Sequence, residues 1–426
     1  MQKNRSKFLT SITCLLFSTG RIRQANVVKI LVVMIFSFSP IYSWGQFEYV
    51  TTHPYAANQV DTKNGENCYG ARIQVLKTYQ GKIYAGYGDG VCNTGPIRVC
   101  GLDPATKKFD CEFTMKTESI QKIDVVGDDL MIAAQDPMGT FTEGHAYATK
   151  INGVWEAKSP AEMSGSLTQG SVHNQRMTRF NGDLYLAGDY YNSLDSKGQH
   201  PVLWKSPDNG QSWEKFRYYP ESISGAKPSS FCAPIVFNGK MYAQVGSFQC
   251  NGLNLFDDDY RTPEVFDSVG SGSYSGLSYG VSTTAAPQSD IAEFKGELVY
   301  LNNSRLLRYN GVDINPIASG GGTRVERYDI NEQAFTVGDN GEYLYVHHQD
   351  RGVCRAKFLS KTGETKFKCF DVTPGHATSS IAVLGDYIYV GTVNSEIWRA
   401  PIPKSSLCLA CLQPIYKLLL LDEAGV

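Results

Sequence analysis

Two neighbouring stretches in the middle of the chain carry side chains suited to acid–base chemistry. His173 and Arg176 lie three residues apart, and Tyr190 and Tyr191 follow at the end of an alternating apolar segment. Histidine and tyrosine exchange protons, and arginine neutralises a carboxylate. With His145, these residues are candidates for β-elimination from a uronate sugar, in which a base removes the ring proton beside the acid group.

Other titratable residues lie in loops beside short apolar strands. Taken singly, each is more typical of a solvated loop or of a turn-stabilising carboxylate. If the strands share one register, these loops converge on one face and form a polar ligand-binding cleft. The candidate ligand-binding residues are Asp89, Glu118, Asp136, Asp189, Asp290, His348, Asp350 and His376.

A repeated hairpin must position these loops. A glycine, a charged or polar residue and an alternating apolar strand recur along the chain at intervals of 44 to 57 residues. Glycine supplies the positive φ of a tight hairpin turn. The repeat glycines are Gly81, Gly127, Gly182, Gly239, Gly296, Gly341 and Gly385.

Further hairpins complete a unit of four strands, which is typical of a propeller blade. One turns on Asn152-Gly153, between Tyr147–Ile151 and Val154–Ala157. The last unit lacks a fourth strand after Glu396–Ala400, whereas Phe47–Thr52 is a strand without a partner. The sequence therefore predicts an all-β fold, a seven-bladed β-propeller closed by the N-terminal strand in the last blade.

The two ends of the chain and its overall charge indicate where the protein is located and which partners it has. Residues 1–45 hold basic residues, a short apolar run and small residues before Gln46, as in a signal peptide. We therefore expect the propeller over 46–403, a tail over 404–426, and secretion to a periplasmic or extracellular site. A net charge of −2 argues against a nucleic-acid partner, and no membrane span is expected once the leader is removed.

Ten cysteines follow the leader, and their spacing suggests local disulfides. The four expected pairs are Cys68 with Cys92, Cys100 with Cys111, Cys232 with Cys250, and Cys354 with Cys369; Cys408 with Cys411 is the remaining pair. No nucleotide-binding or metalloprotease motif is present, so we expect no cofactor except Ca²⁺, for which Asp257-Asp258-Asp259 is a candidate.

One turn carries the pattern S-x-D-x-G-x-x-W, formed by Ser206, Asp208, Gly210 and Trp213. This pattern resembles the Asp box of the bacterial-neuraminidase (BNR) repeat in sialidase-like propellers. The resemblance implies a structural turn remote from the ligand site. It leaves three functions open: a secreted propeller that binds a glycan or another extracellular ligand, a polysaccharide lyase, and a sialidase-like glycosidase with three arginines around the substrate carboxylate.

Overall fold

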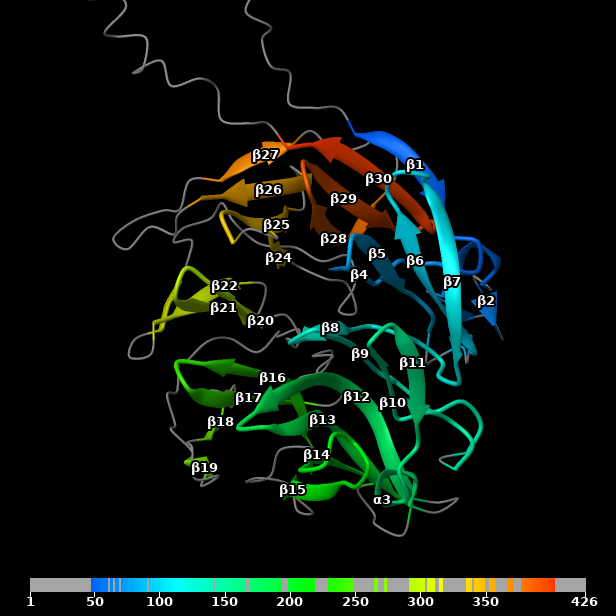
Figure 1. Cartoon of the computed structure of the whole chain (residues 1–426), viewed down its shortest axis with the longest axis vertical. Helices are drawn as coiled ribbons and strands as arrows, with labels where there is room; N and C mark the ends of the chain where they lie inside the picture. Colours follow the sequence, from blue (N-terminus) through cyan, green and yellow to red (C-terminus); the bar gives the residue numbers. More distant parts are fainter. Residues whose placement is uncertain are drawn as a thin grey trace, which may run out of the picture. The chain divides into compact units, whose positions relative to one another are not determined.

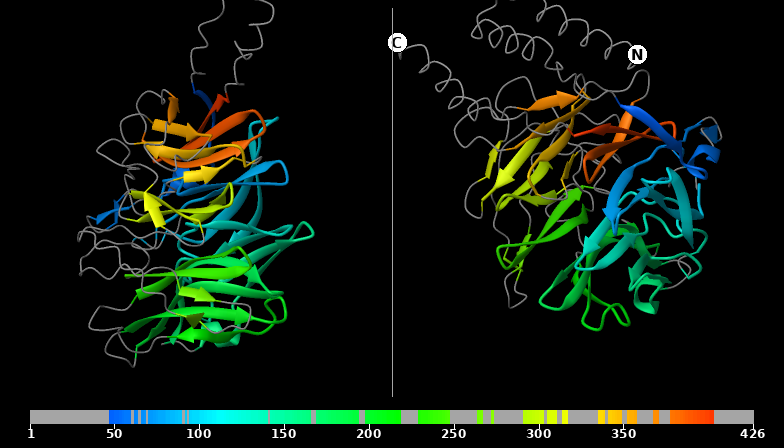
Figure 2. Two further views of the ribbon diagram at one scale, coloured as in Figure 1. Left: turned by 90° about the vertical axis from the view of Figure 1, so that its left-hand side faces the viewer. Right: turned by 45° about the horizontal axis from the view of Figure 1, so that its top comes forward.

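The computed structural model describes residues 47–402 apart from 60–61, 64–65, 69, 90–91, 93, 141, 166–168, 194–197, 219–228, 248–263, 267–271, 274–290, 303–304, 311–313, 317–334, 339–340, 349–351, 358–366 and 371–376. Both the leader (1–45) and the tail (404–426) therefore lie outside the described residues. Figures 1 and 2 show a succession of antiparallel β-hairpins. No helix in the described ranges has the length and apolar character needed to cross a bilayer.

The described strands form seven four-stranded sheets, numbered here in chain order. Sheet 1 holds β4 (Val75–Tyr79), β5 (Lys82–Gly86), β6 (Ile97–Asp103) and β7 (Lys108–Met115). Sheet 2 holds β8 (Ile123–Val126), β9 (Asp129–Ala133), β10 (Tyr147–Ile151) and β11 (Val154–Lys158). Sheet 3 holds β12 (Gln169–Phe180), β13 (Asp183–Asn192), β14 (Gly198–Ser206) and β15 (Glu214–Tyr218).

The remaining sheets follow the same plan. Sheet 4 holds β16 (Ser229–Phe237), β17 (Lys240–Ser247), β18 (Glu264–Phe266) and β19 (Gly272–Ser273). Sheet 5 holds β20 (Ile291–Phe294), β21 (Glu297–Asn302), β22 (Arg305–Tyr309) and β23 (Ile314–Pro316). Sheet 6 holds β24 (Phe335–Val337), β25 (Leu344–His348), β26 (Gly352–Ala356) and β27 (Lys368–Phe370).

Sheet 7 combines the two ends of the described chain. It holds β28 (Thr378–Leu384), β29 (Tyr387–Thr392) and β30 (Glu396–Pro401), together with β1 (Glu48–Thr52). In the β1–β30 pair, Tyr49 lies opposite Trp398 and Thr52 opposite Glu396. Smaller elements are the ribbon of β2 (Thr62–Lys63) and β3 (Glu66–Asn67), the 3-10 helix η1 (Ala56–Asn58) and the short helix α3 (Ala161–Ser164).

The repeat glycines lie in the hairpin between the first two strands of each sheet. All seven have positive φ, between 58° and 91°. At Gly81 the preceding residue Gln80 also has positive φ, so this two-residue turn is of the I′ class that matches the twist of the strands. The local spacing of glycine and apolar residues therefore predicted these hairpins correctly.

Neighbouring sheets contact one another through their first strands. The order of contacts is cyclic: β4, β8, β12, β16, β20, β24, β28 and back to β4. Backbone hydrogen bonds reinforce three of these contacts. Ile73 N–H donates to Thr392 (3.1 Å) and Ile120 N–H to Tyr87 (2.9 Å), just before β4 and β8, and Asn174 N–H, within β12, donates to Ala134 (3.0 Å). The prediction of an all-β propeller fold is confirmed.

Buried apolar side chains fill the spaces between adjacent sheets. One cluster joins sheets 7, 1 and 2 and includes Ile73, Tyr84 and Ile132; a second joins sheets 2 and 3 and includes Tyr147 and Trp204. Alternation along each strand places these side chains on the faces that neighbouring sheets cover. The hydrophobic core therefore runs from sheet to sheet.

An ionic cluster joins sheets 1 and 2 near their outer strands. Glu112 on β7 accepts hydrogen bonds from Lys82 (2.8 Å), Tyr84 Oη (3.1 Å) and Trp155 Nε1 (2.9 Å), and it pairs with Lys150. Burial alone would raise the pKa of Glu112, but the hydrogen bonds from Lys150, Lys82 and Trp155 outweigh it and lower the pKa from 4.5 to about 2. Glu112 is therefore ionised at neutral pH and links the two sheets electrostatically.

Three predicted disulfides are confirmed: Cys68–Cys92, Cys100–Cys111 and Cys354–Cys369. Cys100 and Cys111 lie opposite each other on β6 and β7, and Cys354 and Cys369 lie opposite each other on β26 and β27. The other two predicted pairs, Cys232–Cys250 and Cys408–Cys411, fall on side chains outside the described part of the chain. Oxidised cysteines are typical of exported proteins.

Candidate functional site

A buried histidine between two carboxylates forms the centre of the candidate site. His173 lies on β12 where its pairing with β13 is interrupted, between Val172 and Arg176, and His173 has a φ of 46°. Its Nδ1 is 3.1 Å from Asp189 Oδ2, and its Nε2 is 3.1 Å from Asp136 Oδ1. Asp189 belongs to β13 of sheet 3, whereas Asp136 follows β9 of sheet 2. The imidazole therefore bridges two sheets.

These carboxylates determine the protonation state of His173. Burial alone would lower the pKa of the imidazole, but Asp136 and Asp189 outweigh it and raise the pKa from 6.5 to about 10. The ring is therefore a cation at neutral pH and donates one N–H hydrogen bond to each carboxylate. With no free lone pair, it cannot accept a proton from a substrate.

Backbone contacts hold the loops around this histidine. The carbonyl of Asp136 accepts hydrogen bonds from Glu118 N–H (3.0 Å) and from Thr117 Oγ1 (2.8 Å). Ser119 forms a β-bridge with Gly88, next to Asp89. The structure therefore brings five of the predicted residues to adjoining parts of sheets 1, 2 and 3, with Asp89, Glu118 and Asp136 in loops and His173 and Asp189 on β12 and β13.

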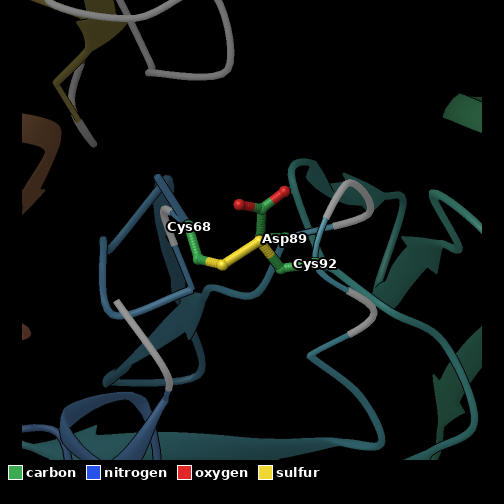
Figure 3. Close-up of side chains that lie close together, drawn as sticks. All are labelled: Cys68, Asp89 and Cys92. Atoms are coloured by element: carbon green, nitrogen blue, oxygen red, sulfur yellow. A yellow bond between two sulfur atoms is a disulfide. The ribbon is translucent and has the colours of Figure 1, made fainter. Parts of the chain in front are cut away.

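Asp89 lies beside a disulfide. Figure 3 shows its carboxylate next to the Cys68–Cys92 bond, and potential ligand atoms of the three residues lie within 4.8 Å of one another. Because the two sulfurs are bonded to each other, they are not thiolates that could bind a metal ion. Thr94 supports the loop by accepting the N–H of Asp89 at 2.6 Å.

Arg176 has a different environment from His173, although the two are close in sequence. Its Nε and Nη2 contact Asp124 Oδ1 at 2.8 and 2.6 Å, and its Nη1 donates to the Ile291 carbonyl at 3.0 Å. Asp124 Oδ2 also accepts the N–H of Met177. Arg176 therefore connects sheets 2, 3 and 5, and its guanidinium is neutralised within the fold.

Tyr190 and His145, two of the three other candidate proton donors, also have partners of their own. The Tyr190 ring packs edge-on against Trp204 (6.0 Å) and its hydroxyl donates to Gln169 (3.3 Å). His145 stacks on Phe113 and accepts the N–H of Lys116 through Nδ1; burial, followed by the charge of Lys116, lowers its pKa.

His173, Arg176, Tyr190, His145 and Tyr191 were named from the sequence as candidates for one catalytic group. In the structure the first four have separate hydrogen-bond or ion-pair partners. The reason is the interrupted pairing on β12 and the alternation on β13, where Asp189 and Tyr190 face opposite sides. Tyr191 follows on the Asp189 side of the strand.

Four predicted ligand-binding residues cannot be placed. Asp290, Asp350 and His376 lie outside the described residues, as does the candidate calcium ligand run 257–259. His348 ends β25, but its side chain is not described. Conversely, Asp124 and Glu112 were missed by the sequence analysis. Their only signal is an acidic residue within an alternating strand, which gives no hint of the partner.

The Asp-box-like turn connects β14 and β15. Asp208 Oδ1 accepts the N–H groups of Gln211 (3.1 Å) and Ser212 (2.8 Å), and Ser206 Oγ donates to the same oxygen (2.8 Å). Side-chain and backbone hydrogen bonds from Ser212 lower the pKa of Asp208 to about 2. Gly210 has a φ of 84°, and buried Trp213 donates to Tyr147 of sheet 2 (3.2 Å).

Four arginines of the described chain each have a partner of their own. Arg98 donates to Thr114, Arg308 pairs with Glu297, and the guanidinium of Arg355 lies over the Tyr343 ring. With Arg176 on Asp124, these side chains have separate partners on sheets 1, 3, 5 and 6. These four side chains therefore do not supply the expected group of three arginines around one carboxylate.

Comparisons with known proteins indicate the fold. No family model and no curated protein matches the sequence. Among solved structures, the chain is similar to the WD40 domain of Neurospora crassa Pan2, with 8% identity, a TM-score of 0.50, and coverage of 86% of this chain and 98% of that one.

Two further matches have lower TM-scores. Virginiamycin B lyase from Staphylococcus aureus matches with 10% identity and a TM-score of 0.48, over 78% of this chain and 95% of that one. The extracellular domain of a hybrid two-component system from B. thetaiotaomicron matches with 11% identity and a TM-score of 0.49, over 84% of this chain and 40% of that one. At such identities the likeness concerns the fold alone: the chain has the β-propeller fold.

Proposed function

We propose that this protein is an exported seven-bladed propeller that binds an extracellular glycan at the loops around His173. The cyclic contacts among the seven sheets support one ring, and the pairing of β1 with β30 supports its closure in the last blade. Three disulfides support export. Ligands of propellers bind at loops of this kind, where several blades contribute side chains.

The array of Asp136, His173 and Asp189 carries the proposal. The side chain of Asp136 is 22% exposed, whereas those of His173 and Asp189 are 6% and 3% exposed. Protonated His173 fixes one oxygen of Asp136, which leaves the other to face a ligand. A carboxylate held in place accepts hydrogen bonds from neighbouring hydroxyls, which sugars supply in pairs.

Binding is favoured over β-elimination because the residues expected to act as base and as carboxylate clamp are already engaged within the fold. His173 is already protonated, and Arg176 is already paired with Asp124. A lyase would need both groups free to act on the substrate. The arrangement instead provides preorganised acceptors, which lower the entropic cost of binding.

Binding to a panel of neutral and uronate-containing polysaccharides tests the proposal. We expect the secreted protein to bind at least one polysaccharide in isothermal titration calorimetry, and Asp136→Asn to weaken that binding at least tenfold, since one lost charge-assisted hydrogen bond corresponds to about 1.5–3 kcal/mol. Glu156→Gln, on the outer strand β11 with a 63% exposed side chain, should bind as the wild type does.

Two results would contradict the proposal. The first is the absence of binding to every member of the panel; the second is equal binding by the wild type and Asp136→Asn. If the same incubations generate the ultraviolet absorbance of unsaturated uronates, the protein is a lyase, and the site has been interpreted wrongly.

A further inference from the structure

Three aromatic side chains on sheet 3 surround a lysine ammonium. Tyr190 comes from β13, Trp204 from β14 and Tyr218 from β15. The Nζ of Lys215 lies 3.3 Å from the Tyr190 ring centroid, 4.6 Å from that of Tyr218 and 5.8 Å from that of Trp204. All three distances are within the range in which an aromatic face attracts a cation.

The rings are arranged as walls of a box rather than as a stack. The planes of Tyr190 and Tyr218 meet at 89° with centroids 5.9 Å apart, and those of Tyr190 and Trp204 meet at 63° with centroids 6.0 Å apart. Rings at such angles can each present part of their negative face to one central charge. We call Tyr190, Trp204 and Tyr218 the aromatic cage.

A β-bulge on β15 creates this arrangement. Val202 lies opposite Tyr218 and Trp204 lies opposite Lys215, with a register shift between Leu203 and Trp204. In a regular strand, Lys215 and Tyr218 would face opposite sides, because they are three positions apart. The additional residue in the bulge returns both side chains to the same face.

Contacts that do not involve Lys215 hold each of the three walls. Trp204 is buried and its Nε1 donates to Ser171 Oγ (3.1 Å), while Tyr190 Oη donates to Gln169 (3.3 Å). Tyr218 packs against His200 with ring centroids 5.7 Å apart. The cage therefore has supports that remain when the lysine is replaced.

The positive charge of Lys215 has different partners from the charges of other lysines that lie over aromatic rings. Lys205 lies over Phe216 and also pairs with Asp183 (3.1 Å), and Lys150 lies over Tyr84 and also pairs with Glu112. Among the described residues, no carboxylate forms an ion pair with Lys215. Burial lowers the pKa of this lysine, as expected for an ammonium whose surroundings are aromatic.

We infer that the aromatic cage is a binding site for the quaternary ammonium group of a small soluble ligand, and that Lys215 is an internal occupant which the ligand displaces. A quaternary ammonium spreads its charge over methyl groups and is weakly hydrated. It therefore loses less hydration free energy than a lysine ammonium does on entering an aromatic site. Lys215 lies on the outermost strand as an exposed residue, so its flexible stem can move into solvent. Tyr190 of the cage and Asp189 of the carboxylate array are adjacent on β13 and face opposite sides of the strand.

Titration with choline and with tetramethylammonium tests this inference. Ionic strength is held constant with sodium chloride, and binding is followed by isothermal titration calorimetry on the full chain. Because a tethered competitor acts at a high effective concentration, we expect Lys215→Ala to bind both cations at least tenfold more tightly than the wild type. Lys205→Ala should behave as the wild type. Adding Tyr218→Ala to Lys215→Ala should weaken binding at least fivefold.

A neutral analogue separates cation recognition from filling of an apolar slot. The alcohol in which carbon replaces the quaternary nitrogen of choline should bind Lys215→Ala at least tenfold more weakly than choline does. Equal binding of the two, or no gain in Lys215→Ala over the wild type, overturns the inference. If circular dichroism shows that Lys215→Ala is unfolded, Lys215→Gln, which also removes the competing charge, answers the same question.

Discussion

Replacing Glu112 with glutamine should weaken the connection between sheets 1 and 2. In the folded protein, hydrogen bonds and ion pairs lower the pKa of Glu112 from 4.5 to about 2, which corresponds to about 3 kcal/mol in favour of the folded state at neutral pH. The cluster is partly solvent-accessible, with the Lys82 side chain 33% exposed. Solvent screening reduces the effect, so we expect a loss of about 1.5 kcal/mol.

The sign of the pH dependence follows from the lowered pKa. The contribution of Glu112 is complete above pH 4.5, its pKa in the unfolded chain, and it is lost as the pH falls toward about 2. Urea unfolding of the wild type and Glu112→Gln at pH 7 should therefore give different free energies of unfolding. The difference should shrink progressively between pH 4.5 and the lowest pH at which the wild type still folds.

Glu156→Gln is the matched control, because it removes one carboxylate from the neighbouring strand β11, where the side chain is 63% exposed. Its expected effect is below about 0.5 kcal/mol. The reasoning would be refuted if Glu112→Gln destabilised the protein no more than Glu156→Gln at pH 7. A difference that stayed constant down to the acid limit would also refute it.

Three further predictions concern other parts of the fold. His173→Asn should lower the free energy of unfolding by about 3 kcal/mol, because it leaves two carboxylates without their shared cation; asparagine is chosen because it tolerates positive φ. In urea unfolding, the greater stability of the wild type should be complete below pH 6.5 and should be lost as the pH rises through about 10. Gly210→Ala places a Cβ 2.5 Å from Tyr147 Oη, whereas Gly182→Ala, also at positive φ, meets nothing within 4 Å; thermal unfolding should show Gly210→Ala to be less stable by about 1–2 kcal/mol, and equal stabilities would disprove the contact. Replacing Cys354 and Cys369 with serine opens a bond that spans 15 residues and should lower the free energy of unfolding by about 3 kcal/mol, while peptide mapping without reductant should recover this pair intact in the wild type.

Local patterns in the sequence were sufficient to predict the hairpins and the short disulfides. The glycine of each hairpin sits where a two- or few-residue turn needs positive φ, and alternation along the strands marks the side that is buried. Cys100 and Cys111 are close in sequence and flank one turn, so their pairing follows from the hairpin itself. Such features depend on residues a few positions apart, which a single sequence contains.

The partners of the titratable side chains were decided only by the tertiary structure. Arg176 reaches Asp124, 52 residues before it, and the Ile291 carbonyl, 115 residues after it. His173 is turned between Asp136 and Asp189 by an interruption of strand pairing that no residue pattern announces. The sequence by itself therefore determined the hairpins. Which charges meet was determined by the packing of one sheet on the next, because one extra residue in a strand reverses the face that a side chain occupies.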